Sequence, residues 1–184
     1  MHTALTDFTR LAAAGMALLL VSCASPRVKH TDYPDGSMVI TRSPGAIQTK
    51  HAGKAVYQKS ASSVAGKAVD FPHNAIVKQN VRHVPCGPHD GFGFLVQISG
   101  LPDGPNEIDV EIQHPLFLSP EDKLGTVKRR TEKIVSRNAK AIWDFVWVFD
   151  TPPQQVPGRW SVRLSYRGRV IYEGSVEAVS PSSP

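Results

Sequence analysis

The second half of the chain alternates apolar and polar residues with a period of two. The alternation runs through residues 92–98, 108–112, 160–166 and 170–178. Because successive side chains of a β-strand point to opposite faces, each segment is predicted to be a strand with one face in a core. No window has a sustained helical period, so the pattern predicts an all-β protein.

Turn residues separate these segments. Arg167-Gly168 is a two-residue, glycine-containing connection suited to a tight hairpin, and Pro-Asp-Gly at 102–104 and Val-Pro-Gly at 156–158 indicate further turns. About seven strands fit between residues 75 and 184. This spacing is typical of an antiparallel β-sandwich, and we expect a single such domain there.

The segment 141–149 (AIWDFVWVF) differs because both of its faces are largely apolar, with Asp144 as the only charge. We interpret it as a central strand of the sandwich. The alternative is that Trp143 and Trp147 form an exposed aromatic face that binds a cell-wall glycan or a hydrophobic partner, since tryptophan anchors many interfaces. Burial of both tryptophans would exclude this alternative.

The N-terminus has the pattern of a lipoprotein signal peptide. Residues 11–22 form a 12-residue apolar run after Arg10, and Cys23 follows at once. Such a run has the length of a signal-peptide core and is too short to span a bilayer. The ending Leu-Val-Ser-Cys at 20–23 resembles the lipobox of bacterial lipoproteins, in which the cysteine is lipidated and becomes the mature N-terminus. Residues 1–22 are therefore predicted to be a signal peptide, with Cys23 as the lipidation site. An ordinary signal peptide cleaved elsewhere, or a short buried helix, remains the alternative.

Residues 23–74 are rich in Ser, Gly, Pro and Lys. Residues 23–80 carry eight basic and three acidic side chains, so this part of the chain holds the whole formal net charge of +5. We predict that residues 23–74 are a flexible basic tether between the lipid and a sandwich domain at 75–184. The alternative is that residues 38–57 add a strand or hairpin. Because the rest of the chain is neutral, a basic face for nucleic acid is not expected.

One segment has the spacing of a metal site. His83, Cys86 and His89 form a His-x-x-Cys-x-x-His pattern, and imidazole with thiolate suits zinc or copper. His73, His114 or Asp90 could complete such a site. The competing interpretation is a loop whose side chains share no common geometry, with Cys86 buried as a small apolar residue. If Cys23 is lipidated, Cys86 has no partner for an intramolecular disulfide.

Motifs of the common enzyme classes are absent from the sequence. It contains no Gly-x-Ser-x-Gly elbow, no His-Glu-x-x-His pair, no phosphate-binding glycine loop and no dinucleotide-binding fingerprint. We therefore expect a protein that is not an enzyme and that needs no cofactor other than the covalent lipid.

The order of motifs across residues 75–180 resembles a family of exported bacterial proteins known as domain of unknown function 3859. The resemblance rests most on Phe149-Asp150-Thr151-Pro152, followed by Val-Pro-Gly-Arg-Trp at 156–160 and the hairpin at 166–169. It implies an immunoglobulin-like sandwich and brings no established activity or catalytic residue with it. The basic stretch at 128–130 and Cys86 depart from the family pattern.

These observations together predict a lipoprotein of the bacterial cell envelope. Ala24, directly after the lipidated cysteine, favours the outer membrane, with the domain facing the periplasm. The expected function is a non-catalytic interaction module that binds another envelope protein or a surface polymer. The two alternatives are a periplasmic zinc- or copper-binding protein that uses His83, Cys86 and His89, and a glycan-binding module built on Trp143 and Trp147.

Overall fold

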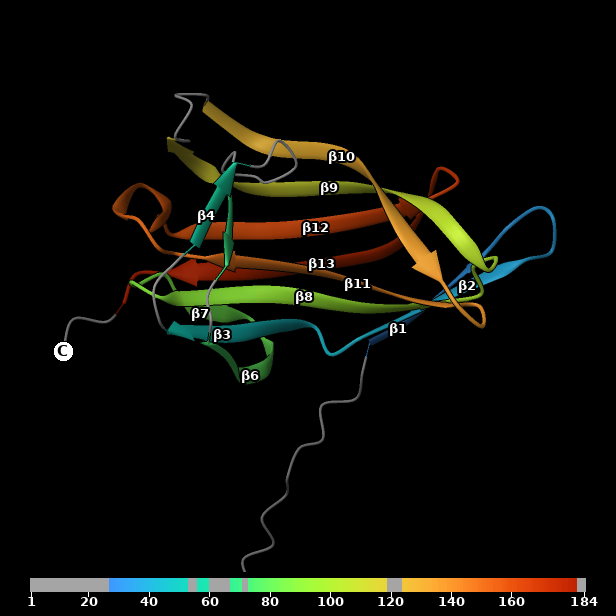
Figure 1. The fold of residues 1–184 in the computed structure, drawn as a ribbon, viewed down its shortest axis with the longest axis horizontal. Coiled ribbons are helices and arrows are strands. Elements are labelled where there is room, and N and C mark those ends of the chain that lie inside the picture. The colour runs from blue at the N-terminus through green and yellow to red at the C-terminus, as the bar shows by residue number, and fades with distance from the viewer. Residues whose placement is uncertain (1–26, 53–55, 60–66, 71–72, 119–123, 182–184) are drawn as a thin grey trace, which may run out of the picture.

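The protein is built almost entirely from β-strands, as a computed structural model shows (Figure 1). The structure describes residues 27–52, 56–59, 67–70, 73–118 and 124–181. Within these ranges the only helix is the 3-10 turn η1 (Pro152–Gln154), and no helix there has the length and apolarity needed to cross a membrane. The predicted all-β class is confirmed.

The first sheet has six strands arranged around the long strand β8. On one side of β8 lies β11, and on the other side β2 and β3 pair with its two ends. β1 pairs with β2, and β6 pairs with β3. The strands are β1 (Arg27–Asp32), β2 (Met38–Ser43), β3 (Ala46–Ala52), β6 (His73–Val81), β8 (Asp90–Ser99) and β11 (Lys140–Val148).

The second sheet has the strand order β10-β9-β12-β13-β7, and every pair in it is antiparallel except β13 with β7. Its strands are β7 (His83–Pro85), β9 (Gly104–Leu118), β10 (Leu124–Ser136), β12 (Gly158–Tyr166) and β13 (Arg169–Val179). A separate two-stranded sheet pairs β4 (Val56–Lys59) with β5 (Lys67–Asp70).

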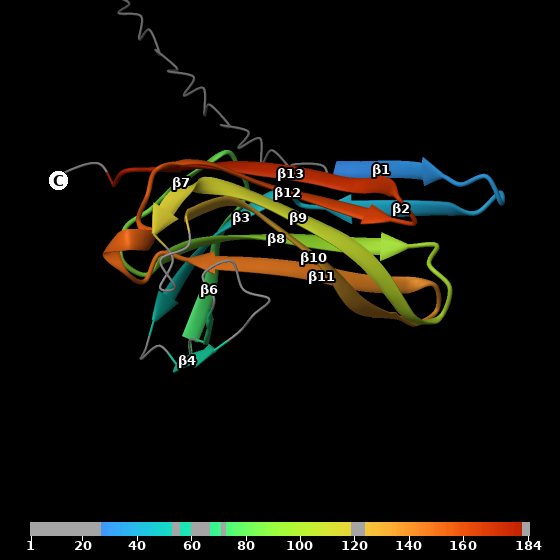
Figure 2. The same ribbon diagram turned by 90° about the horizontal axis from the view of Figure 1, so that it is seen from above.

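The two large sheets form the layers of a β-sandwich. Figure 2 shows β13, β12 and β9 in one layer and β8 and β11 in the other. Phe92 lies at the centre of the core, where its ring packs edge-on against Trp160 at 5.2 Å and touches Phe94, Phe145 and Phe149. Because these inward residues alternate along their strands, burial of one apolar face per strand forms the core. The predicted antiparallel β-sandwich is confirmed.

The prediction of a flexible tether over residues 23–74 is wrong for residues 27–52, which the structure describes. Residues 27–52 form β1, β2 and β3, and the structure buries Val39, Thr41 and Ser43 on β2. The alternative of an added strand or hairpin within residues 38–57 is the better prediction for this segment, although β1 begins before it. The alternation in 38–43 is short and contains Thr and Ser at buried positions, so it lacks the apolar period that identifies a strand. The domain therefore begins well before residue 75, and it has more than the seven strands that were expected.

β1, β2 and the turn between them close one side of the sandwich against the hairpin of β12 and β13. Buried Thr41 donates its hydroxyl to the Ile171 carbonyl oxygen at 2.7 Å, and the Tyr33 hydroxyl donates to the Tyr166 carbonyl oxygen at 2.9 Å. Ser43 lies within hydrogen-bond distance of the Tyr172 hydroxyl. Polar side chains on β2 are thus buried because they satisfy groups of β13, whose edge is otherwise unpaired there.

The last hairpin forms as its turn residues predict. Arg167 and Gly168 have φ angles of +48° and +73°, as a tight two-residue hairpin loop requires. The pairing of β12 with β13 shifts register between Leu164 and Ser165. Consequently Ile171 and Tyr172 are neighbours in sequence and both are buried.

Candidate functional site

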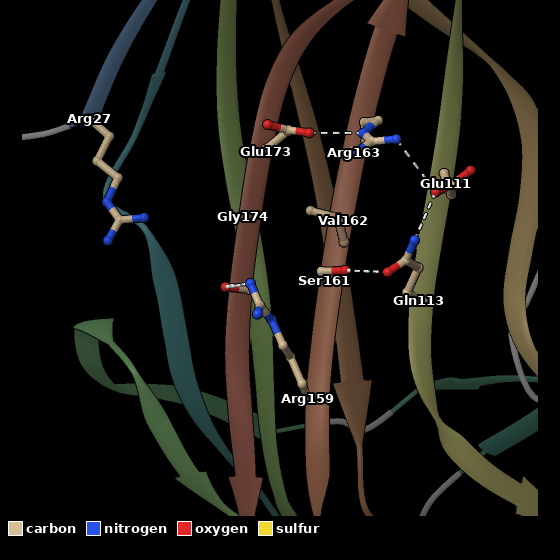
Figure 3. Close-up of a pocket in the computed structure, with 10 residues that line it drawn as sticks. Arg27, Glu111, Gln113, Arg159, Ser161, Val162, Arg163, Glu173 and Gly174 are labelled. Atoms are coloured by element: carbon tan, nitrogen blue, oxygen red, sulfur yellow. Dashed lines mark hydrogen bonds and ion pairs between the residues drawn. The ribbon is translucent and has the colours of Figure 1, made fainter.

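The outward face of the second sheet carries a row of alternating charges. Arg129 on β10, Glu111 on β9, Arg163 on β12 and Glu173 on β13 are direct partners in the strand register. Arg129 Nε lies 2.6 Å from Glu111 Oε2, and Arg163 Nε lies 2.8 Å from Glu173 Oε1. Arg163 also approaches Glu111 at 3.9 Å, so the row is continuous (Figure 3). Neighbouring strands therefore pair opposite charges across the exposed face.

This row borders a shallow hollow of about 430 Å³. Gln113 donates to Glu111 at 3.1 Å, and Figure 3 shows Ser161 beside Gln113 on the next strand. The hydrogen bond from Arg129 is the main reason that the pKa of Glu111 lies below its ordinary value, so this carboxylate is held in its charged form. The hydrogen bonds and ion pairs of Glu111 thus lie within the sheet. The positive and negative charges of the row therefore neutralise one another.

The outward face of the first sheet is apolar at β8 and β11. Leu95, Ile142 and Val146 have exposed fractions of 39%, 67% and 45%. Asp144 pairs with Leu95, so Ile142 and Val146 flank that pair along β11. Gly93 pairs with Val146, and a Cβ atom at Gly93 would lie 3.4 Å from a Val146 methyl group. We call Leu95, Ile142 and Val146 the β11 patch. Leu95 lies on β8, and Ile142 and Val146 lie on β11, which pairs only with β8 in its sheet.

The interpretation of residues 141–149 as a central strand is wrong, because β11 lies at the edge of its sheet. Its residues alternate strictly between buried and exposed positions from Lys140 to Trp147. The sequence offered one signal for this arrangement: Asp144 stands between Ile142 and Val146 on the apolar face, and an unpaired carboxylate is rarely buried.

Trp143 and Trp147 are core residues. Their exposed fractions are 2% and 6%, and Trp147 packs on Trp160 with a 4.7 Å distance between ring centroids. Trp143 also donates its indole N–H to Glu132 at 2.8 Å. The alternative of an aromatic binding face formed by these two residues is therefore wrong, since neither ring is available to a ligand.

The three residues of the proposed metal site lie in and after β7. His83 and His89 are exposed, whereas Cys86 is buried and its sulfur lies 3.8 Å from the Gln155 carbonyl oxygen. Across the part of the chain that the structure describes, no group of three or more His, Cys, Asp or Glu side chains is arranged to hold a metal ion. Burial raises the pKa of the Cys86 thiol, which favours the neutral form over the thiolate that metals bind.

Cys23, the predicted lipidation site, lies outside the described residues. The nearest described residue is Arg27, the first residue of β1. The sequence places only three residues between them, so a lipid on Cys23 would be attached close to the folded domain.

The chain is similar to an immunoglobulin-like protein from Pseudomonas aeruginosa whose crystal structure was determined at 1.50 Å. The two are 19% identical, the similarity covers 71% of this chain and 96% of that one, and the TM-score is 0.48. An alkylpurine DNA glycosylase from Pseudomonas fluorescens, bound to DNA with an abasic site analog, is 13% identical over 55% of this chain and 28% of its own, with a TM-score of 0.36. A β-glucosidase from Listeria innocua in complex with glucose is 15% identical over 53% and 15%, with a TM-score of 0.32.

No family model matches the sequence, and no curated protein matches it. The resemblance to the exported family of unknown function therefore stays a prediction.

Proposed function

We propose that this protein is a lipid-anchored component of the bacterial cell envelope whose sandwich binds another envelope protein through β11. The anchor would be a lipid on Cys23, in the outer membrane, with the domain facing the periplasm. No step of this function requires catalysis. The observation that carries the proposal is the β11 patch, because exposed apolar side chains lie there on an edge strand.

Edge strands are usually protected by charges, prolines or bulges, since their free backbone groups can pair with another chain. On β11 the exposed positions are Lys140, Ile142, Asp144 and Val146, so half of them are apolar. A partner strand could extend the first sheet along the free edge of β11 and cover Ile142 and Val146 at the same time. The partner's matching strand would have apolar residues at alternate positions.

The anchor is tested by the intact mass and membrane partitioning of the protein expressed in a bacterium, with Cys23→Ala as the comparison. We expect the wild type to carry lipid at Cys23 and to sediment with membranes, and the variant to be released or unprocessed. Equal processing and equal solubility of both would contradict the anchor.

The binding surface is tested with a photo-crosslinking amino acid placed at Ile142 and, as a control, at Val135. Val135 is also an exposed apolar residue, with an exposed fraction of 61%, but it lies on β10. The expected result is one discrete adduct from position 142 that Val146→Lys abolishes without lowering the melting temperature. Equal adducts from both positions, or an adduct that Val146→Lys leaves unchanged, would refute the role of β11.

A further inference from the structure

A second hollow lies where β12 and β13 meet β1, the start of β3 and the end of β6. It has a volume of about 290 Å³, and three arginines line it: Arg27, Arg82 and Arg159. They come from the first residue of β1, the residue before β7, and the start of β12. Arg27 also borders the larger hollow beside the charge row, where Figure 3 shows its side chain apart from the ion pairs of that row.

The backbone fixes the positions of these arginines around β13. Arg159 is the register partner of Glu177, and the Glu177 amide donates to the Arg82 carbonyl oxygen at 2.8 Å. Arg27 is the register partner of Ser43, and the Ser43 hydroxyl lies within hydrogen-bond distance of Tyr172 on β13. The arrangement is therefore a property of the fold, although the three residues lie far apart in sequence.

Most of the donor capacity of these guanidinium groups is unused. Arg159 reaches the Ser175 hydroxyl at 3.5 Å, and neither Arg27 nor Arg82 forms an ion pair or a side-chain hydrogen bond with a described residue. The only carboxylate that lines the hollow is that of Glu177. Three positive charges thus face one negative charge, whereas Arg129 and Arg163 in the charge row nearby each pair with a carboxylate.

We propose that this hollow binds a phosphate group. A guanidinium group presents several N–H donors in a plane, which matches the oxygens of phosphate, and the Ser175 hydroxyl adds a further donor. A bound phosphate would also relieve the repulsion among the three arginines, which a neutral or cationic ligand would not.

The occupant that we assign is the phosphate of an anionic phospholipid headgroup, and this assignment rests on the lipid anchor proposed above. Arg27 follows Cys23 by four positions, so even a fully extended chain holds the two within about 14 Å. A lipid on Cys23 would keep the hollow next to the membrane surface. Anionic lipids attract basic side chains over about this distance.

The experiment is a titration of the full chain with inorganic phosphate and, separately, with glycerophosphoglycerol, the soluble headgroup of phosphatidylglycerol. The readout is the melting temperature, because a ligand that binds only the folded state stabilises it. We expect both compounds to raise it. Arg82→Gln and Arg159→Gln should each raise the dissociation constant about tenfold, which is the loss of affinity expected for one charge-assisted hydrogen bond.

Arg42→Gln is the matched control. Arg42 is exposed on β2 and does not line the hollow, so the same loss of charge there should leave the dissociation constants unchanged. Without ligand, Arg82→Gln and Arg159→Gln should melt no lower than the wild type, which separates lost binding from lost folding.

The outcomes are distinct. Binding of both compounds that depends on Arg82 and Arg159 supports the proposal. Binding of inorganic phosphate alone overturns the headgroup assignment, and no binding, or equal binding by all variants, overturns the site. Lipid on Cys23 is detected separately, by the intact mass of the protein. Failure of the anchor and failure of the phosphate site can therefore be told apart.

Discussion

The connection between β10 and β11 contains two residues with left-handed backbone conformations. Asn138 and Ala139 have φ angles of +52° and +57°, and Arg137 and Lys140 exchange backbone hydrogen bonds on either side of them. The Ala139 amide donates to Asp103 at 2.7 Å, which ties this turn to the neighbouring one. Asparagine tolerates this region well, whereas the Cβ atom of an alanine is strained there. The backbone strain of this turn therefore lies at Ala139.

Replacing Ala139 with glycine should therefore stabilise the protein. The sequence Asn-Gly is the preferred one for this kind of hairpin turn, and we expect Ala139→Gly to raise the free energy of unfolding by about 0.5–1 kcal/mol. Urea denaturation of both proteins measures the difference. Ala141→Gly is the matched control, because Ala141 is buried in β11 and its replacement should destabilise the strand. An unchanged or lower free energy of unfolding for Ala139→Gly would contradict the argument.

At the scale of elements, the sandwich depends on β2 as a cover for β13. Thr41 is 1% exposed, and its hydroxyl satisfies the Ile171 carbonyl oxygen at the point where β13 has no strand partner on that side. Thr31 on β1 approaches the Val170 carbonyl oxygen in the same way, at 3.4 Å. Side chains of one sheet thus complete the hydrogen bonding of the other.

Thr41→Val should show how much the hydrogen bond from Thr41 to β13 contributes to the free energy of unfolding. Valine has the shape of threonine but cannot donate, so it leaves the Ile171 carbonyl oxygen buried without a partner, and we expect the free energy of unfolding to fall by about 1–2 kcal/mol. Thr131→Val serves as the control. Thr131 also donates a hydrogen bond, to Asp109 at 2.9 Å, but that bond is exposed, so its loss should be nearly neutral. Equal effects of the two substitutions would argue against a special role of β2.

At the scale of the whole molecule, two histidines link the fold to pH. Burial lowers the pKa of His51 and of His114 below the ordinary value of 6.5, and the nearby His89 adds to the effect on His51. His114 lies against Trp160, with 5.3 Å between ring centroids. Both rings are therefore neutral in the folded protein at a pH where the unfolded chain already binds protons.

The sign of the pH dependence follows from this difference. Because the unfolded state binds more protons, the free energy of unfolding should decrease as the pH falls from about 7 to 5. His114→Gln should make this decrease smaller, because it removes one of the two groups whose pKa burial lowers. Chemical denaturation at three pH values measures the slopes. A wild-type stability that is constant across this range would contradict the expectation.

The sequence predicts the parts of this fold that depend on local patterns. The alternation in 92–98 and 160–166 identifies two core strands, and Arg167-Gly168 identifies the last turn. It fails for β2, because Thr41 and Ser43 are buried through hydrogen bonds to a strand about 130 positions away. The same limit applies to the arginine hollow. Residues 27, 82 and 159 come together only through strand pairing, which no local pattern encodes.

The closure of β1 and β2 on the last hairpin has a consequence for the order in which the chain folds. Tyr33 and Thr41 bond to residues 166 and 171, which lie 133 and 130 positions further along the chain. β1 and β2 therefore lack their final partners until residues 166–171 have been synthesised. Long-range pairing of this kind makes folding slow. The signal peptide predicted for residues 1–22 would export an unfolded chain, and late completion of the fold favours such a route.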